Sequence, residues 1–155
     1  MGLALRSLGH GRRVLIAQFL KDGRSGELAA LAHLNRRRSI RPSRFRALFC
    51  HVAGRREEAA RQQNAQAADI QKTAEAIQPA LTVLDELNVA LSCGMVTQEN
   101  AEKLIDAALA FGDVVSTGRN APEWLRARAD YVSEIAAQKH PFETEKLAAR
   151  EGIEY

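Results

Sequence analysis

The sequence is poor in cysteine, in aromatic residues and in long hydrophobic runs, and these shortages exclude several classes of protein. Its two cysteines, Cys50 and Cys93, form no C-x-x-C pair, so we expect neither a disulfide framework nor a zinc site. Its longest apolar run, Val14 to Leu20, falls far short of the ~20 residues that span a bilayer. No small-residue cleavage site follows the apolar start, which argues against a secretory signal. We therefore expect a cytoplasmic protein with reduced thiols and no membrane partner.

The phosphate-binding motif G-x-x-x-x-G-K-[ST] is a further absence. Gly2 to Gly11 has the pattern of the end of a helix, and Val14 to Leu20 that of the strand after it. In many α/β proteins a strand and a glycine-rich phosphate loop precede such a helix. The chain therefore opens where we expect a nucleotide-binding fold to be already under way.

What the sequence does have is an ordinary globular composition with a strongly uneven charge. Its 155 residues are 46% hydrophobic and 26% charged, which suits one domain with a sizeable core. Met1 to Arg61 contains fourteen Lys and Arg against four Asp and Glu, whereas Gln62 to Tyr155 contains eight against fifteen. The formal net charge of +3 therefore hides a basic first part and an acidic second part.

Two interpretations of the densest basic stretch are open. A run of arginines can be an electrostatic footprint for nucleic acid or another polyanion. It can also be a solvated loop, which is favoured because only Phe45 and Phe49 interleave with the arginines and no nucleic-acid motif frames them. We therefore expect no nucleic-acid partner. The arginines concerned are Arg36, Arg37, Arg38, Arg41, Arg44, Arg46, Arg55 and Arg56.

Hydrophobic periodicity predicts helices and strands that alternate along the chain. After the first strand we expect helices at Gly26 to Leu34, about Arg55 to Gln78, Thr97 to Ala110 and from about Pro122. We expect further strands at Leu81 to Leu87, Asp113 to Thr117 and Tyr131 to Ile135, a basic loop containing Pro42, and an irregular tail from His140. Strands separated by helices imply crossover connections and a mostly parallel sheet.

In such sheets ligands bind beyond the carboxyl ends of the strands, so the residues there are the first candidates for a site. The strand Leu81 to Leu84 runs into Asp85 and Glu86, the pattern of an apolar strand that delivers acids to a Mg²⁺ ion on nucleotide phosphates. Because adjacent strand residues point to opposite faces, at most one of these acids can face the metal without a bend. The alternative is that two acids simply end a strand.

Two other predicted strands also end in polar residues. After the strand at 113–117, the run Thr117-Gly118-Arg119-Asn120 offers a hydroxyl, a glycine and a fixed positive charge suited to an anion, although a tight turn would explain it equally well. After the first strand, Gln18 and Lys21 place an amide and an ammonium at the same edge, and Gly26-Glu27 follows.

Taken in order, these segments resemble the ATP:corrinoid adenosyltransferases of cobalamin biosynthesis. The resemblance covers nearly the whole chain, because five pieces match in the correct order and spacing. They are GLALRSLGHGRRVLIAQFLK at Gly2 to Lys21, the Gly26-Glu27 pair, VLDELNVAL at Val83 to Leu91, STGRNAPE at Ser116 to Glu123, and KHPF with GIEY near the end.

The resemblance implies an α/β fold like that of P-loop NTPases (RecA-like), a single domain over residues 1–155 with a mostly parallel sheet and helices on both faces. It also implies transfer of the 5′-deoxyadenosyl group of ATP to the cobalt of a reduced corrinoid, with release of triphosphate. Mg²⁺ or Mn²⁺ would be the metal, ATP and the corrinoid the small-molecule partners, and the assembly a homodimer.

The resemblance also assigns roles to residues of this chain. Glu86 and Arg119 would be catalytic, and Asp85 with Glu86 would hold the metal. Asn88 would orient the two acids. The nucleotide would be bound by a set drawn from several segments, namely Arg6, Gln18, Lys21, Glu27, Thr117 and Asn120.

The chain also departs from the family pattern. The family's amino-terminal strand and its loop G-x-G-K-G-K-T-T are absent, so we expect a chain incomplete at its N-terminus that binds ATP poorly and exposes sheet edges where a central strand is missing. The family's paired aromatics over the corrinoid are replaced by Phe45 and Phe49 in an altered spacing, and Lys146 and Ala148 stand where a glycine and a lysine are expected before GIEY.

These departures keep a second hypothesis open, a non-catalytic truncated homologue that acts as a corrinoid-binding or oligomerising module. The coding sequence upstream of Met1 discriminates between the two, since a strand and phosphate loop encoded there would favour the enzyme.

Overall fold

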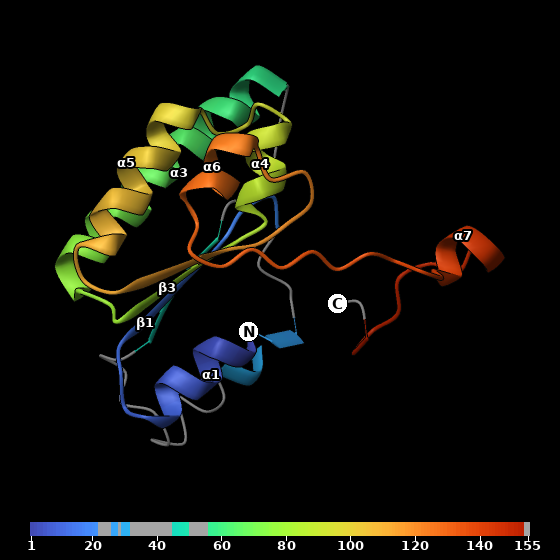
Figure 1. Ribbon diagram of the computed structural model, residues 1–155, viewed down its shortest axis with the longest axis horizontal. Helices are drawn as coiled ribbons and strands as arrows, with labels where there is room; N and C mark the ends of the chain where they lie inside the picture. The colour runs from blue at the N-terminus through green and yellow to red at the C-terminus, as the bar shows by residue number, and fades with distance from the viewer. Residues whose placement is uncertain (22–25, 28, 32–44, 50–55, 154–155) are drawn as a thin grey trace. The chain divides into compact units, whose positions relative to one another are not determined.

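The computed structural model describes residues 1–21, 26–27, 29–31, 45–49 and 56–153 (Figure 1). The chain divides into two compact units, Met1–Pro122 and Glu123–Tyr155. No helix among the described residues is long and apolar enough to cross a membrane.

The first unit alternates helices and strands, as the hydrophobic pattern predicts. Its elements are α1 (Gly2–Gly9), β1 (Val14–Gln18), β2 (Phe45–Phe49), α3 (Arg56–Ile77), β3 (Leu81–Asp85), α4 (Leu87–Ser92), α5 (Gln98–Leu109) and β4 (Asp113–Ser116). Residues 26–27 and 29–31 are also helical, and the remainder of the helix predicted at 26–34 lies outside the described residues.

The four strands form one parallel sheet in the order β2-β1-β3-β4. The long helices α3 and α5 lie on one side of this sheet and α1 lies on the other (Figure 1). The α/β class and the parallel sheet with helices on both faces are therefore confirmed. Because all four strands run the same way, their carboxyl ends meet at one edge, where Gln18 is level with Asp85 and Leu84 with Ser116.

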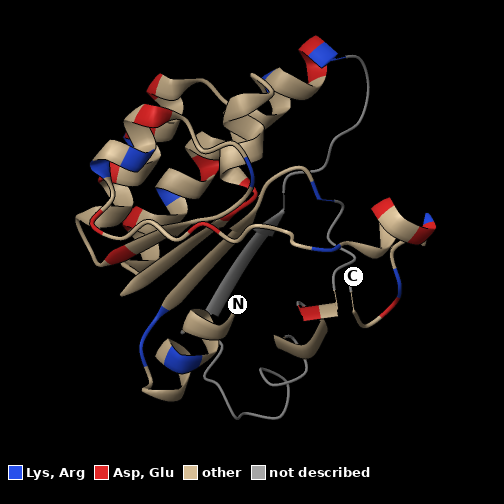
Figure 2. Ribbon diagram, turned by 45° about the vertical axis from the view of Figure 1, so that its right-hand side comes forward, with Lys and Arg blue, Asp and Glu red and all other residues tan. Residues whose placement is uncertain are grey.

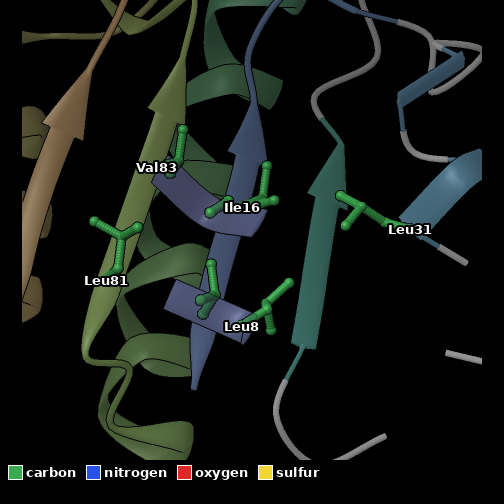
Figure 3. Close-up of a cluster of buried hydrophobic side chains, with 7 residues drawn as sticks. Leu8, Ile16, Leu31, Leu81 and Val83 are labelled. Carbon is green, nitrogen blue, oxygen red and sulfur yellow. The ribbon is translucent and has the colours of Figure 1, made fainter. Parts of the chain in front are cut away.

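The core beneath α1 explains why this short helix stays on the sheet. Ala4 and Leu8 of α1 pack with Ile16 of β1 and Val83 of β3 in one buried cluster, which Figure 3 shows together with Leu31. Every residue of β1 is buried, the pattern expected of a strand covered on both faces. β1 therefore cannot shift its register without exposing apolar side chains.

The opposite face carries α3 and α5, which pack against each other. The buried residues of α3 are mostly alanines, which allow a close approach, whereas α5 contributes the larger Leu104 and Ile105. Asn64 joins the two helices, because its Oδ1 accepts from the backbone N–H of Thr97 at 3.0 Å and from Asn100 Nδ2 at 2.7 Å. Thr97 caps α5, its side chain accepting from the N–H of Asn100.

The first unit differs from the prediction at two places. The strand expected to reach Leu87 ends at Asp85, and α4 begins at Leu87. Glu86 between them has φ 62°, a left-handed conformation that no strand continues through. The second difference is β2, which lies where a basic loop was expected.

Most of the basic stretch lies outside the described residues, including Arg36–Arg38, Arg41, Arg44 and Arg55. Figure 2 shows the charges of the described part in blue and red and leaves that stretch grey. The two interpretations of the arginines remain predictions.

The second unit contains α6 (Glu123–Arg128), which confirms the helix predicted from about Pro122, and α7 (Pro141–Glu145). The strand predicted at Tyr131 to Ile135 is wrong, because these residues are extended coil and Tyr131 is 94% exposed. A strand is stable only when it hydrogen-bonds to a neighbouring strand. The alternation of apolar residues does not indicate whether the edge of a sheet is close enough for such pairing. The prediction of an irregular tail is also wrong in part, because His140 caps α7 by accepting from the N–H of Phe142.

Candidate functional site

The carboxyl ends of β1 and β3 bring together polar side chains from distant parts of the sequence. Gln18 ends β1 and Asp85 ends β3, and the parallel register sets them side by side. Lys21 follows β1 directly, and Glu27 belongs to the next helical residues. We call Gln18, Lys21, Glu27, Asp85 and Thr117 the Asp85 cluster, since Asp85 contacts most of its other members.

Both oxygens of the Asp85 carboxylate accept hydrogen bonds. Lys21 Nζ donates to Oδ2 at 2.8 Å, and Gln18 Nε2 donates to the same oxygen at 3.0 Å. Thr117 Oγ1 donates to Oδ1 at 2.7 Å. The carboxylate is thus held by three donors from two segments, the end of β1 and the end of β4, which fixes its orientation.

Glu27 extends the cluster as a second acid on the same two donors. Its Oε1 accepts from Gln18 Nε2 at 3.1 Å and lies 3.6 Å from Lys21 Nζ. Gln18 is fully buried, while the Lys21 and Glu27 side chains keep about a third of their surface exposed, at 34% and 33%. The buried amide of Gln18 therefore bridges Asp85 and Glu27, and Lys21, the other donor near both acids, is partly exposed to solvent.

The charges of the cluster shift the pKa values of its members. Burial alone would raise the pKa of Asp85, but the hydrogen bonds from Lys21, Thr117 and Gln18 outweigh it and hold that pKa below its ordinary value. Burial alone would lower the pKa of Lys21, but its hydrogen bond to Asp85 and the charges of Asp85, Glu27 and Glu86 raise it overall. At neutral pH the lysine is therefore a cation and Asp85 an anion.

Glu86 sits at a sharp bend, which bears on whether both acids can serve one ligand. Its φ of 62° places it between the end of β3 and the first residue of α4. Its backbone N–H donates to Thr117 Oγ1 at 3.3 Å, so the same hydroxyl contacts both acidic residues. In a regular strand the side chains of Asp85 and Glu86 would point to opposite faces of the sheet. The left-handed conformation of Glu86 provides the bend that interrupts this alternation.

Asn88 connects the start of α4 with the end of β4. Its Nδ2 donates to the carbonyl of Gly118 at 3.1 Å, its backbone N–H donates to the carbonyl of Thr117 at 3.1 Å, and its Oδ1 accepts from the hydroxyl of Ser116. Asn88 thus links α4 to the end of β4, while Lys21, Gln18 and Thr117 make the hydrogen bonds to Asp85. Ser116 was missed by the sequence analysis, because a serine on a strand gives no signal of its own.

Gly118 allows the chain to turn closely over α4. Its φ is +118°, and a Cβ there would lie 3.2 Å from the backbone nitrogen of Val89 and 3.3 Å from Asn88 Cβ. Any other residue would be strained in both backbone and packing. The turn that places Thr117 on Asp85 therefore depends on this glycine.

Three predicted site residues do not join the cluster. Arg119 and Asn120 follow Gly118 and are exposed, and Asn120 has φ 58°. Arg6 is exposed in the last turn of α1, the end that leads into the amino-terminal end of β1. Among the described residues, no hydrogen bond or ion pair is found that links any of the three to Asp85.

The donor set suits a hard cation bound together with phosphate. Within the described ranges no group of three or more His, Cys, Asp or Glu is arranged to hold a metal ion. Mg²⁺ on a nucleotide, however, is usually held by one or two carboxylates plus phosphates and waters. Asp85 and Glu86 with the Thr117 hydroxyl fit that requirement, since all are oxygen donors.

Comparison with known proteins decides what kind of chain carries this site. The sequence matches the family described as ATP:corrinoid adenosyltransferase BtuR/CobO/CobP over residues 1–155. The chain belongs to this family. It is also 32% identical over 164 residues to a corrinoid adenosyltransferase from Pseudomonas aeruginosa, an alignment that covers 99% of this chain and 75% of that protein. The family resemblance predicted from the sequence is confirmed. The Asp85 cluster therefore lies in a member of the corrinoid adenosyltransferase family.

Proposed function

We propose that the protein transfers the 5′-deoxyadenosyl group of ATP to the cobalt of a reduced corrinoid and releases triphosphate. Family membership over the whole chain supports this reaction class. The observation that carries the proposal within the structure is the Asp85 carboxylate, oriented at the carboxyl edge of a parallel sheet by Lys21, Gln18 and Thr117. That edge is where α/β proteins bind nucleotides, and we propose a P-loop NTPase-like fold on the same grounds.

The proposed reaction does not require a nucleophilic side chain from the protein. The reduced cobalt of the substrate is itself the nucleophile, so a cobalt–carbon bond forms at C5′ as the bond from C5′ to the triphosphate oxygen breaks. The chain has to align the two substrates and offset the charge of the departing triphosphate. Oriented side chains and cations at the sheet edge can do both.

Asp85 and Glu86 would hold a divalent cation, Mg²⁺ or Mn²⁺. When bound, that ion would neutralise charge on the phosphate oxygens of the leaving group. The bend at Glu86 interrupts the alternation of the strand, and the Thr117 hydroxyl contacts both the Asp85 carboxylate and the backbone N–H of Glu86. Glu86 also acts as a catalytic residue in this proposal, since it would touch the metal beside the reacting phosphates.

The other predicted residues would bind the nucleotide. Lys21 and Gln18 already lie at the edge of the sheet, and Glu27 shares their hydrogen bonds. Arg119, the second proposed catalytic residue, is exposed and would reach the triphosphate as a fixed cation. The remaining members of the set, contacting the nucleotide from the loop after β4 and from α1, are Thr117, Asn120 and Arg6.

The missing phosphate-loop motif sets the expected strength of binding. Backbone N–H groups and a lysine of such a loop make charge-assisted hydrogen bonds worth about 1.5–3 kcal/mol each. We therefore expect the 155-residue chain to bind ATP weakly. A second candidate function is that of a non-catalytic homologue that binds corrinoid or forms oligomers, including a homodimer.

An adenosylation assay tests the proposal. The chain is mixed with ATP, Mg²⁺ and a chemically reduced corrinoid, and the absorbance change of cobalt–carbon bond formation is followed together with triphosphate release. We expect both products in equal amounts at high ATP concentration, and we expect Asp85→Asn to lower the rate at least about a hundredfold. Glu99→Gln, an acid on the exposed face of α5, is the matched control.

The opposite result separates the two candidates. Corrinoid binding without triphosphate release, even at saturating ATP, would support the non-catalytic homologue. Sedimentation of the chain alone and with corrinoid would then show whether a dimer forms.

A further inference from the structure

The Asp85 carboxylate already has a cation beside it. Lys21 Nζ lies 2.8 Å from Oδ2, a distance typical of a charge-assisted hydrogen bond. The second donor to that oxygen, Gln18 Nε2 at 3.0 Å, is neutral and belongs to a fully buried side chain. A divalent cation that binds Oδ2 would therefore compete with the ammonium of Lys21.

Lys21 also balances more than one acid. Its ammonium lies 3.6 Å from Glu27 Oε1 and feels the charge of Glu86. Without it, the charges of Asp85, Glu27 and Glu86 would lack the positive charge that this lysine supplies, and like charges at short range repel. The lysine thus occupies the place in the charge balance that a bound metal would take.

The lysine has room to leave. Its side chain keeps 34% of its surface exposed, and a four-carbon stem lets the ammonium move several ångströms while the backbone stays in place. Gln18 and Thr117, which would remain, keep Asp85 oriented. Departure of Lys21 would therefore free one oxygen of the carboxylate without releasing the whole group.

We infer that Lys21 is a resident counter-cation of Asp85 that gives way when a divalent cation binds. This inference rests on the proposed function only in taking Asp85 as a metal ligand. It predicts that the metal binds more weakly than the acids alone would allow, because it competes with a charge carried by the chain itself. It also predicts that the freed ammonium becomes accessible to other anions at the same edge.

The test measures Mn²⁺ binding to the 155-residue protein by electron paramagnetic resonance, with no nucleotide present. We expect Lys21→Met to bind Mn²⁺ at least about tenfold more tightly than the wild type, because a competing unit charge is removed. Lys21→Arg keeps the charge and should stay within about threefold of the wild type. Lys103→Met removes an exposed lysine on α5 and should leave the affinity unchanged.

A second measurement follows the lysine in the wild-type protein and does not depend on a variant that folds. The protein is treated briefly with an amine-acylating reagent at rising Mn²⁺ concentration, and acylation of Lys21 is read by mass spectrometry of its peptide. We expect Lys21 to be slow to react without metal and several-fold faster at saturating Mn²⁺. Lys103 serves as the internal control whose reactivity stays constant.

Each pattern of results has a distinct meaning. Equal Mn²⁺ affinity in the wild type and Lys21→Met, or Lys21 acylation that ignores Mn²⁺, would overturn the inference while leaving Asp85 as a metal ligand. Adding Asp85→Asn to Lys21→Met should abolish the tight binding. If Mn²⁺ binds equally well without the Asp85 carboxylate, or binds neither the wild type nor any variant, both the inference and the metal site of the proposed function are wrong.

Discussion

Two lysine–carboxylate pairs in this protein have nearly the same length and very different surroundings. Lys103 Nζ lies 2.6 Å from Glu99 on α5, where both side chains are more than half exposed, at 59% and 75%. Lys21 Nζ lies 2.8 Å from Asp85, where the side chains are 34% and 22% exposed. The first pair spans one helical turn, and the second joins residues 64 positions apart.

The pKa values of the two carboxyl groups, Asp85 and Glu99, also reflect this difference in surroundings. The hydrogen bond from Lys103 and its charge lower the pKa of Glu99, with burial a minor opposing effect. The pKa of Asp85 is lowered against a leading opposition from burial, because three donors act together. Distance alone therefore does not measure what a pair contributes, and the number of donors and the solvent around them decide it.

The strongest way to separate the two pairs is to remove each acid. Asp85→Ala leaves Lys21, Gln18 and Thr117 without their common acceptor, and we expect it to lower the free energy of unfolding by about 2–3 kcal/mol after allowing for the solvent that reaches Lys21. Glu99→Ala is the matched control, with an expected urea midpoint close to that of the wild type. Urea unfolding at pH 7 measures both, and equal losses would contradict the comparison.

Acid titration sharpens the comparison. A carboxyl whose pKa is lowered by folding stabilises the folded protein above its unfolded pKa of about 3.9, and that contribution is lost as pH falls through the folded pKa. The stability difference between the wild type and Asp85→Asn should therefore be constant from neutral pH to about 5 and shrink below about 4. Urea unfolding at a series of pH values measures it. A difference that persists unchanged to pH 2 would show that the charge of Asp85 is not the source of the stability.

A smaller effect is expected when one donor of the cluster is removed. Thr117→Val keeps the shape but deletes the hydroxyl that donates to Asp85 and accepts from the N–H of Glu86. We expect a loss of about 1 kcal/mol in the free energy of unfolding. The pKa of Asp85 should also move up toward its ordinary value, so the acid-dependent loss should begin at higher pH. Thr73→Val on the exposed side of α3 is the control.

The smallest effect is expected at the exposed pair itself. Lys103→Met and Glu99→Gln should leave the urea midpoint unchanged in physiological salt, because solvent and ions screen such a pair. A double-mutant cycle in low and in high salt measures the coupling. A coupling at Lys103–Glu99 as strong as that at Lys21–Asp85 would show that solvent exposure does not weaken the first pair.

Most of the fold follows from local sequence pattern. The apolar run at β1 and the hydrophobic periodicity of α3 and α5 are strong local signals, and the structure has these elements where they are expected. β2 and α4 could not be predicted so well. β2 lies among arginines that suggest a loop, and α4 is six residues long and starts after a left-handed residue, which no periodicity reveals.

The candidate site was predictable by position but not by contact. Polar residues after β1, β3 and β4 were expected at one edge because the strands are parallel, and the structure joins Gln18, Lys21, Asp85 and Thr117 there. What the sequence does not contain is which donor meets which acceptor. The role of Asn88 shows this, since its amide turns toward the loop after β4 while Thr117 takes the contact with Asp85.

The parallel pairing of β1 with β3 has a consequence for how the protein reaches its native state. Gln18 and Asp85 are 67 residues apart in sequence, so a long loop must close before their contact can form. Chains dominated by such distant pairings fold slowly, because entropy is lost well before the contacts repay it. The Asp85 cluster therefore requires β1, β3 and β4 to have come together, and a probe that detects it reports the assembly of these three strands.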